Sequence, residues 1–240
     1  MTEGWQSYRT EKLPEATVLR LGLYQRVLAE FARARRTTIS SDELGRHTGE
    51  NPANVRKDLS RLGTLGTRGT GYDVGTIAAR IDEVFATSTP RRVVVVGLGN
   101  LGRALVRSRS FFQQGFEVAA LFDSSPAVVG TTVAGHVVQP MESVTPEVEA
   151  LGARFGVLTV PPEAAQDAVE RLVRGGVGYI VNFAPKLLQV EPTVVVRYVD
   201  LSIELQMLGY VEAQGLRSTT SSSIGSSGRQ LGSPSAEVLS

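Results

Sequence analysis

Apolar residues near the start of the chain recur at the three- and four-residue intervals of an amphipathic helix. The stripe begins after Pro14 and consists of Val18, Leu19, Leu21, Leu23, Val27, Leu28 and Phe31. A run of cations, Arg33, Arg35 and Arg36, follows it, and positive charge is favourable at the C-terminal end of a helix. The pattern therefore predicts one long helix that begins at Pro14 and ends in this arginine run.

Two shorter helices, separated by a tight turn, are predicted next. Ser41 suits the N-cap of the first, which has an acidic first turn and is broken by Gly49. Asn51 suits the N-cap of the second, and Pro52 its first helical position. Two short helices after a longer one are typical of a helix-turn-helix, here placed between Tyr24 and Gly63.

The segment Gly63–Tyr72 is too rich in glycine to be the interior of a helix. It suits a tight β-hairpin, the wing of a winged helix. Helical periodicity returns over Val74–Phe85, and residues 87–90 (TSTP) are interpreted as a linker. We therefore expect a winged-helix DNA-binding domain over residues 1–86.

From Arg91 onward, β-branched runs alternate with helical stretches. The expected strands are RRVVVV, FEVAALFD, RFGVLTVP, VGYIVNFAP and VVVRYVD. Such alternation indicates an α/β fold with a parallel sheet. We expect a Rossmann domain over residues 91–200, a helix from Leu201 to about Gln214, and a disordered tail over residues 217–240, which is rich in Ser, Gly and Thr.

A glycine-rich turn joins the first of these strands to the next helix: Gly97, Leu98, Gly99, Asn100, Leu101 and Gly102. In this spacing the first glycine permits the turn, the second lets backbone approach a pyrophosphate, and the third lets helix and strand pack closely. Asp123 lies 21 residues past Gly102, where a carboxylate accepts hydrogen bonds from ribose hydroxyls and repels a 2′-phosphate. The pattern predicts NAD(H) rather than NADP(H), with a ligand-free Rossmann turn as the alternative.

Residues suited to catalysis are few. The chain has no cysteine, and its two histidines, His47 and His136, are far apart, so neither a metal site nor a histidine-based triad is expected. His136 falls in a predicted exposed turn, and Lys186, the better candidate for proton transfer, is also explained as a surface lysine. We therefore do not expect an enzyme, although an NAD-dependent oxidoreductase whose front domain does not bind DNA stays an alternative.

The sequence shows no feature of a membrane protein or of a secreted one. No apolar run reaches the roughly 18 residues of a membrane span, and the N-terminus lacks the apolar core of a signal peptide. The sequence thus predicts a soluble, cytoplasmic protein without a membrane partner. A structural or CoA-binding Rossmann protein is a third hypothesis, against which Asp123 argues.

The second short helix, PANVRKDLSRL over residues 52–62, carries the candidate DNA contacts. Its apolar face, Val55, Leu59 and Leu62, should pack inward. The opposite face carries the polar residues Asn54, Lys57 and Arg61, with Arg56 beside them and Arg68 on the hairpin. Arginine can read guanine, asparagine adenine, and lysine can hold phosphate. Residues 1–72 carry a net charge of +4 and residues 73–240 one of −3, which favours a polyanion as the partner of the N-terminal part. The alternative for the second short helix is a solvated amphipathic helix that binds no DNA.

Seven motifs occur in order between Pro14 and Tyr210: VRKDLS (55–60), GTRGTGY (66–72), VVGLGNLGRAL (95–105), LFDSSP (121–126), LTVPPEAAQ (158–166), VNFAP (181–185) and VDLSIELQMLGY (199–210). Together they resemble the Rex family of redox-sensing transcriptional repressors. The resemblance implies a homodimer on palindromic operator DNA, with the helix from Leu201 to Gln214 exchanged between subunits. It also implies repression when the protein is free or bound to NAD+, and release from DNA when NADH binds.

The resemblance extends the cofactor site beyond the glycine turn and Asp123. The added residues are Ser124, Thr159, Val160, Pro161, Asn182, Phe183, Ala184 and Pro185. The chain departs from the family in two places. Aromatic residues common after the RKDLS motif are absent, and Ser108 stands where a tyrosine linked to switching is usual, while its carboxylate partner, Asp200, is present. Ser108 and Asp200 are thus the predicted switch residues, with a weaker response to NADH.

Overall fold

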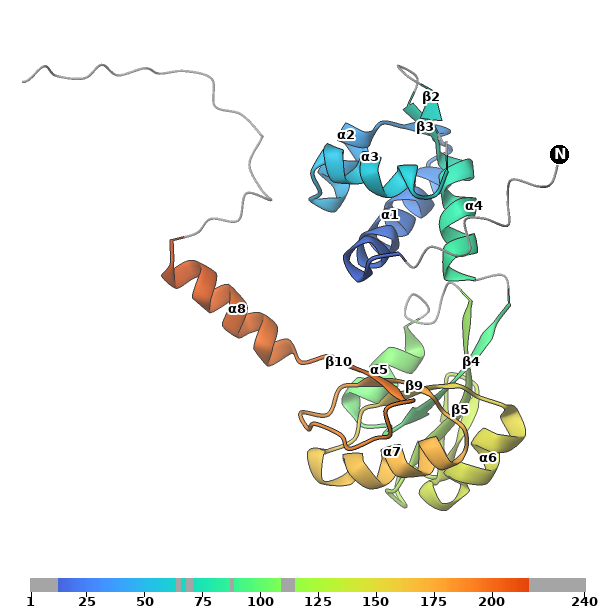
Figure 1. Ribbon diagram of the computed structural model, residues 1–240. Coiled ribbons are helices and arrows are strands. Elements are labelled where there is room, and N and C mark those ends of the chain that lie inside the picture. The colour runs from blue at the N-terminus through green and yellow to red at the C-terminus, as the bar shows by residue number, and fades with distance from the viewer. Residues whose placement is uncertain (1–12, 64–65, 68–70, 87–88, 109–114, 216–240) are drawn as a thin grey trace, which may run out of the picture.

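The computed structural model describes residues 13–63, 66–67, 71–86, 89–108 and 115–215. These residues form two domains (Figure 1). The helices of the N-terminal domain enclose one hydrophobic core, and a larger sheet in the second domain has a core on each of its faces. The expected tail over residues 217–240 and the tip of the expected hairpin, with Arg68, lie outside the described residues.

The N-terminal domain combines a helix-turn-helix with a small antiparallel sheet of order β1-β3-β2. Its elements are α1 (Glu15–Arg33), β1 (Thr38–Ile39), α2 (Ser41–Thr48), α3 (Pro52–Ser60), β2 (Gly66–Thr67), β3 (Gly71–Asp73) and α4 (Val74–Phe85). The inward face predicted for α3 is confirmed, because Val55, Leu59 and Leu62 are buried. They pack with apolar residues of α1 and α4.

Two local details of this domain differ from the expectation, the N-cap of α2 and the end of α3. The N-cap of α2 is Ser40, whose Oγ accepts a hydrogen bond from the Glu43 N–H at 3.1 Å; Ser41 is the first helical residue. Helix α1 ends at Arg33, within the predicted arginine run, and Arg35 has a φ of 56°, which no continuing helix allows. Helix α3 ends at Ser60, so Arg61 and Leu62 follow it.

The second domain is a seven-stranded sheet of order β10-β9-β8-β4-β5-β7-β6, in which β6 runs antiparallel to β7 and the other pairs are parallel. Its strands are β4 (Arg91–Val96), β5 (Phe116–Asp123), β6 (Thr132–Val133), β7 (His136–Pro140), β8 (Phe155–Leu158), β9 (Tyr179–Asn182) and β10 (Val195–Tyr198). Strands are added on one side of β4 up to β7 and then on its other side from β8 onward, so the strand order reverses between β4 and β8. Ligands of such folds bind at this point, beyond the carboxyl ends of the strands.

Helices cover both faces of the sheet, which explains the unbroken apolar run in β4. The helices are α5 (Asn100–Arg107), α6 (Val144–Leu151) and α7 (Ala165–Arg174). Val94 and Val96 pack in the core beneath α6 and α7, whereas Val93 and Val95 pack in the core beneath α5. Because neighbouring residues of a strand point to opposite faces, a strand covered on both sides needs apolar residues throughout.

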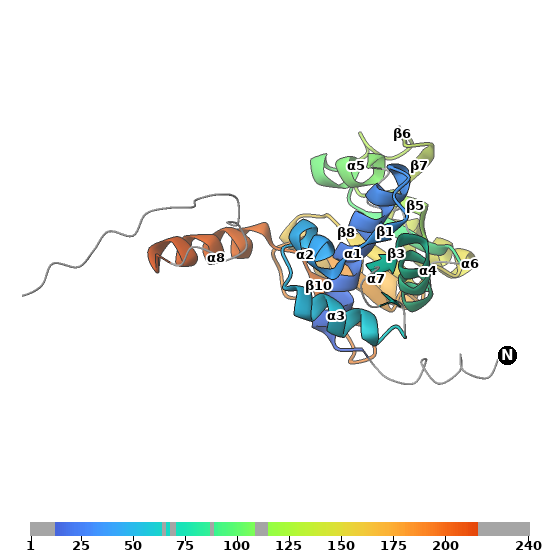
Figure 2. The same cartoon turned by 90° about the horizontal axis from the view of Figure 1, so that it is seen from above.

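The last described helix, α8 (Leu201–Ala213), stands away from both domains in the two ribbon views (Figures 1 and 2). None of its residues is buried, even though many of them are apolar. Six large apolar side chains are each more than half exposed: Leu201, Ile203, Leu205, Met207, Leu208 and Tyr210. Among the described residues, no helix combines the length and apolarity that crossing a membrane requires.

Candidate nucleotide-binding and DNA-binding sites

The turn between β4 and α5 has the backbone geometry of a tight phosphate-binding turn. Gly97 has a φ of 95°, and a Cβ built on it would lie 2.8 Å from the Thr159 carbonyl oxygen. A Cβ on Gly102 would lie 2.0 Å from the Gly97 carbonyl oxygen. The packing of the chain itself therefore requires glycine at both positions.

Gly99 differs from these two glycines. It is exposed, its φ is −67°, and a Cβ built on it would meet no atom within 4 Å. It is also the N-cap of α5 and brings no side-chain cap to the first turn of the helix, whose N–H groups lack partners within the helix. The turn thus offers backbone donors and the positive end of a helix dipole to an approaching anion.

The Asp123 carboxylate is held beside this turn at the end of β5. Its Oδ2 accepts a hydrogen bond from the Leu98 N–H at 2.6 Å, and its Oδ1 accepts one from the Ser125 N–H at 2.8 Å. A carboxylate has about four lone-pair positions, so each oxygen keeps capacity for a further donor. The neighbouring Ser124 is exposed.

The loops after β8 and β9 lie at the same edge of the sheet as the glycine turn. The Thr159 hydroxyl donates to the Gly97 carbonyl at 2.6 Å, so residues 159–161 are tied to the glycine turn. The buried Asn182 holds its own loop: its amide donates to the Ala184 and Lys186 carbonyls at 3.1 Å, and its Oδ1 accepts from the Ala184 N–H at 2.9 Å. The predicted stretches therefore converge, with the Asn182 side chain occupied in shaping the loop that contains Phe183 and Pro185.

The two predicted switch residues lie at helix ends. Ser108 ends α5, with its N–H donating to the Ala104 carbonyl at 3.1 Å. Asp200 is the N-cap of α8, where its Oδ1 accepts from the N–H and the hydroxyl of Ser202 at 2.8 and 2.6 Å. These hydrogen bonds lower the pKa of Asp200. The carboxylate thus fixes the start of the projecting helix, a role that the sequence interpretation did not include.

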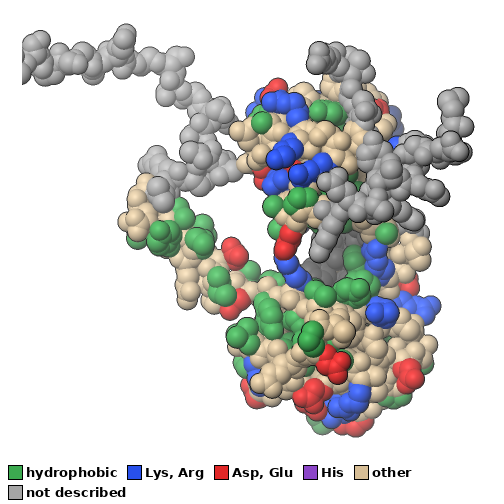
Figure 3. Space-filling model, viewed as in Figure 1, with side chains coloured by type: hydrophobic (Ala, Val, Ile, Leu, Met, Phe, Trp, Pro, Cys, Tyr) green, Lys and Arg blue, Asp and Glu red, His purple; other side chains and the backbone are tan. Residues whose placement is uncertain are grey.

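Helix α3 presents a polar outer face, and Lys and Arg side chains gather on the N-terminal domain in the view of Figure 3. Asn54, Arg56 and Lys57 are exposed there. The Arg56 guanidinium also donates to the Ser41 hydroxyl at 3.0 Å, which joins the two helices of the helix-turn-helix.

Arg61 does not share this outer face, contrary to the expectation. The Arg61 side chain lies against α1 and donates to the Thr17 hydroxyl at 2.8 Å. Arg61 keeps a right-handed helical backbone and lies one turn after the buried Asp58, so its side chain reaches the same Thr17 hydroxyl that Asp58 contacts.

A buried ionic cluster beneath α3 was missed by the sequence interpretation. Asp58 is fully buried and accepts hydrogen bonds from the Thr17 hydroxyl at 3.0 Å, Arg20 Nε at 2.6 Å, Arg20 Nη2 at 2.8 Å and the Tyr24 hydroxyl at 3.0 Å. Burial alone would raise the pKa of Asp58, but these hydrogen bonds outweigh it, and the pKa lies below its usual range. The available signal was spacing, since Asp58 shares the inward face with Val55, Leu59 and Leu62.

These features define a class: a DNA-binding helix-turn-helix domain joined to a dinucleotide-fold domain. Residues 88–186 match the family model described as "CoA binding domain", and residues 12–60 match "Putative DNA-binding protein N-terminus". The redox-sensing transcriptional repressor Rex of Streptomyces griseus is 47% identical over 204 residues, covering 85% of this chain and 81% of that protein. Rex of Desulfitobacterium hafniense is 40% identical over 202 residues, covering 84% and 96%.

Solved structures agree with this assignment. The structure of RSP with β-NAD+ and operator DNA is 30% identical, with a TM-score of 0.78, and covers 86% of this chain and 95% of that one. RSP with β-NADH is 28% identical, with a TM-score of 0.75 and coverages of 86% and 97%. The chain belongs to the Rex family of redox-sensing transcriptional repressors. The predicted family and fold class are confirmed, and the chain is a regulator rather than the oxidoreductase considered as an alternative.

Proposed function

We propose that this protein is a homodimeric repressor that binds a palindromic operator when free or bound to NAD+ and leaves it when NADH binds. It acts in the cytoplasm, where operator DNA and NAD(H) are both present. The observation that carries the proposal is the conformation of the glycine turn beside Asp123, in the same chain as an exposed, polar recognition helix.

The nucleotide half of the proposal rests on what surrounds Gly99. Internal packing accounts for glycine at positions 97 and 102 but not at 99, where an approaching pyrophosphate supplies the reason. Asp123 then receives the adenosine ribose and disfavours a 2′-phosphate. Residues 159–161 and 182–185 line the path toward the nicotinamide. Two solved family structures, of RSP with β-NAD+ and with β-NADH, support this choice of ligand.

The DNA half rests on α3. Asn54, Arg56 and Lys57 are exposed on it, while its inner face is anchored by Asp58. A helix held this way can enter a major groove, with Asn54 and Arg56 reading base edges and Lys57 contacting phosphate. Arg61 is left out of the base-reading set because it is only partly exposed and its side chain lies against α1, whereas Arg56, which also makes one hydrogen bond, is exposed. Arg68 stays a proposed contact by its place in the sequence alone.

The dimer rests on α8. Burial of a large apolar side chain contributes about 1.5–3 kcal/mol, and α8 exposes six of them. A second copy that contributes the same helix would cover them with two-fold symmetry, and a palindromic site matches that symmetry. Because Ser108 reaches less far than the tyrosine usual in the family, we expect the NADH response to be weaker than is usual.

The test is selection of bound sequences from random duplex DNA, followed by fluorescence anisotropy on the selected site with NAD+, NADH, NADPH or CoA added. We expect a palindrome, a dimer by light scattering, and release of DNA by NADH alone. Release by CoA but not by NADH would refute the nucleotide assignment. A monomer that binds a non-palindromic site would refute the dimer.

A further inference from the structure

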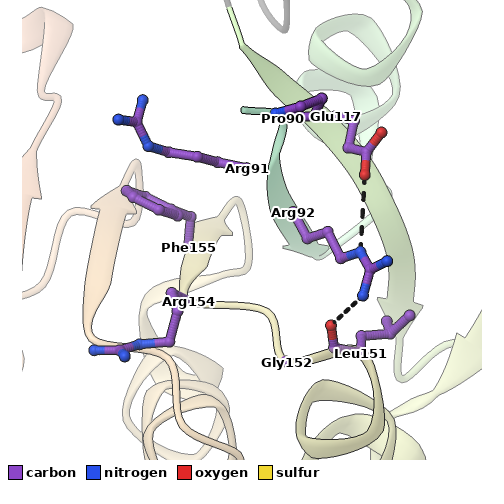
Figure 4. A pocket seen from close by; sticks show the side chains of 8 residues that line it. All are labelled: Pro90, Arg91, Arg92, Glu117, Leu151, Gly152, Arg154 and Phe155. Atoms are coloured by element: carbon purple, nitrogen blue, oxygen red, sulfur yellow. Dashed lines mark hydrogen bonds and ion pairs between the residues drawn. The ribbon is translucent and has the colours of Figure 1, made fainter. Parts of the chain in front are cut away.

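One side chain, Arg91, connects the two domains. It begins β4, and its Nη2 donates a hydrogen bond to the carbonyl of Phe85, the last residue of α4, at 2.8 Å. Its guanidinium also lies over the rings of Phe116 and Phe155, 5.4 and 6.0 Å from their centres. Figure 4 shows the Arg91 side chain extended beside Phe155. Arg91, at the start of β4, therefore contacts the helix that closes the DNA-binding domain and the two strands on either side of its own, β5 and β8.

Both ends of this connection are fixed. Phe116 and Phe155 meet edge to face at 5.3 Å, and Phe155 stacks on Tyr179 at 5.0 Å, so the rings bind together the starts of β5, β8 and β9. At the other end, Phe85 packs against the core of the N-terminal domain. Closely packed groups of this kind move together, because a shift of one group alone would create a clash or a void.

Arg91 adds a donor to the C-terminal end of α4, which is otherwise capped by the Ala86 N–H on the carbonyls of Asp82 and Glu83. The last carbonyls of a helix have no partner within it, and a cation there is favourable. The helix closes at Ala86, which has a φ of 50°, a left-handed conformation that residues with a Cβ seldom adopt. A residue of the nucleotide-binding sheet thus supplies a partner to the last carbonyl of a helix of the DNA-binding domain.

We propose that Arg91 is the positioning residue that transmits the state of the nucleotide site to the DNA-binding domain. Strand β4 begins at Arg91 and runs directly into the Gly97 turn, and it is paired with β5 on one side and β8 on the other. A shift at the turn therefore moves the whole strand, and Arg91 carries that movement to α4. The role rests on the proposed function, since it requires that NADH change the affinity for DNA.

A second connection runs through the ion pair of Glu15, at the start of α1, with Arg197 of β10. Their side chains are 67% and 59% exposed. Exposed ion pairs are screened by water and salt and hold geometry weakly. The half-buried contact of Arg91 with Phe85 is therefore the better route for coupling.

The experiment compares Arg91→Ala with Arg92→Ala in the full chain. Arg92 lines the same hollow in Figure 4 but stays within the sheet domain: its Nη1 donates to the Leu151 carbonyl at 2.6 Å, and its Nε lies 3.8 Å from the Glu117 carboxylate. Each variant removes one positive charge, and only R91A removes the contact with α4. The coupling ratio to be measured is the operator Kd with saturating NADH divided by the Kd without it, with NADH affinity measured separately by calorimetry.

We expect R92A to keep the wild-type coupling ratio and R91A to reduce it by about 2- to 30-fold, the range for residues on a coupling route, with NADH affinity unchanged. Arg91→Lys, which keeps a donor for Phe85 but loses the planar stacking, should give an intermediate ratio and decides the question should R91A fail to fold. A wild-type ratio in R91A, or in R91K if only that variant folds, would overturn the role of Arg91, as would an equal loss in R92A. A ratio of one in the wild-type protein would instead refute the proposed function, and the role of Arg91 with it.

Discussion

Replacing Asp58 with alanine should lower the free energy of unfolding of the DNA-binding domain more than any substitution of an exposed residue in that domain. Asp58 is fully buried and takes four hydrogen bonds, two of them from Arg20, which is itself 21% exposed. Removing one partner of a buried pair costs about 3–5 kcal/mol, because the remaining charge loses its compensation. Small domains are stable by only about 5–15 kcal/mol, so D58A should remove a large share of the stability.

The same cluster predicts a dependence on pH. Hydrogen bonds hold the folded-state pKa of Asp58 below the unfolded value of about 3.9. The contribution of the carboxylate is therefore fully present above the unfolded pKa and is lost as the pH falls through the folded pKa. The wild-type domain should lose this contribution below about pH 4, whereas Asp58→Asn should be less stable at neutral pH and lack that part of the acid dependence.

The assay is hydrogen exchange of the amides of α1 and α3, read by mass spectrometry, which reports this domain separately from the sheet. Asp42→Ala is the matched control, because Asp42 is exposed in the first turn of α2. Exchange in D58A should be faster across both helices, and in D42A close to wild type. Equal protection in D58A and wild type would show that the buried cluster does not stabilise the domain.

Gly99→Ala should keep the wild-type melting temperature but weaken NADH binding at least about tenfold, or 1.4 kcal/mol. Gly102→Ala should instead lower the melting temperature, because its Cβ would lie 2.0 Å from the Gly97 carbonyl oxygen. Unchanged NADH affinity in G99A would contradict the role proposed for Gly99. Asp123→Asn should weaken NADH binding and narrow the difference between the NADH and NADPH affinities measured by calorimetry. The amide has a single acceptor oxygen, whereas the two carboxylate oxygens each accept a hydrogen bond, one from the Leu98 N–H and one from the Ser125 N–H. An unchanged difference between the two affinities would remove Asp123 from the ribose site. Lys57→Ala should weaken binding to all DNA sequences and flatten the salt dependence by about one unit of slope in anisotropy titrations, and a loss confined to the operator would instead make Lys57 a base reader.

What could be predicted from the sequence was local in origin. The helix spacing after Pro14, the glycine turn at Gly97 and the apolar run of β4 each depend on neighbours within a few residues, so the kinds of element and their order followed from pattern alone. The family motifs extended this to the ligand class. Asp123 was placed correctly at the end of a strand because its distance from the turn reflects one strand-turn-helix-strand unit.

Tertiary structure decided which partner each side chain found. Arg61 was assigned to the outer face by helical spacing, yet its side chain donates to Thr17 of α1. Asp58, which the sequence interpretation missed, is buried because α1 brings Arg20 and Tyr24 to it. The order of the strands and the contact of Arg91 with Phe85 likewise join positions that no periodicity relates. The sequence by itself therefore determined the elements and the glycine turn between β4 and α5, because these arise from short-range sterics and hydrogen bonding. Packing between distant segments decided which charges are exposed and how the two domains are joined, because burial and ion pairing depend on contacts that form only in the folded chain.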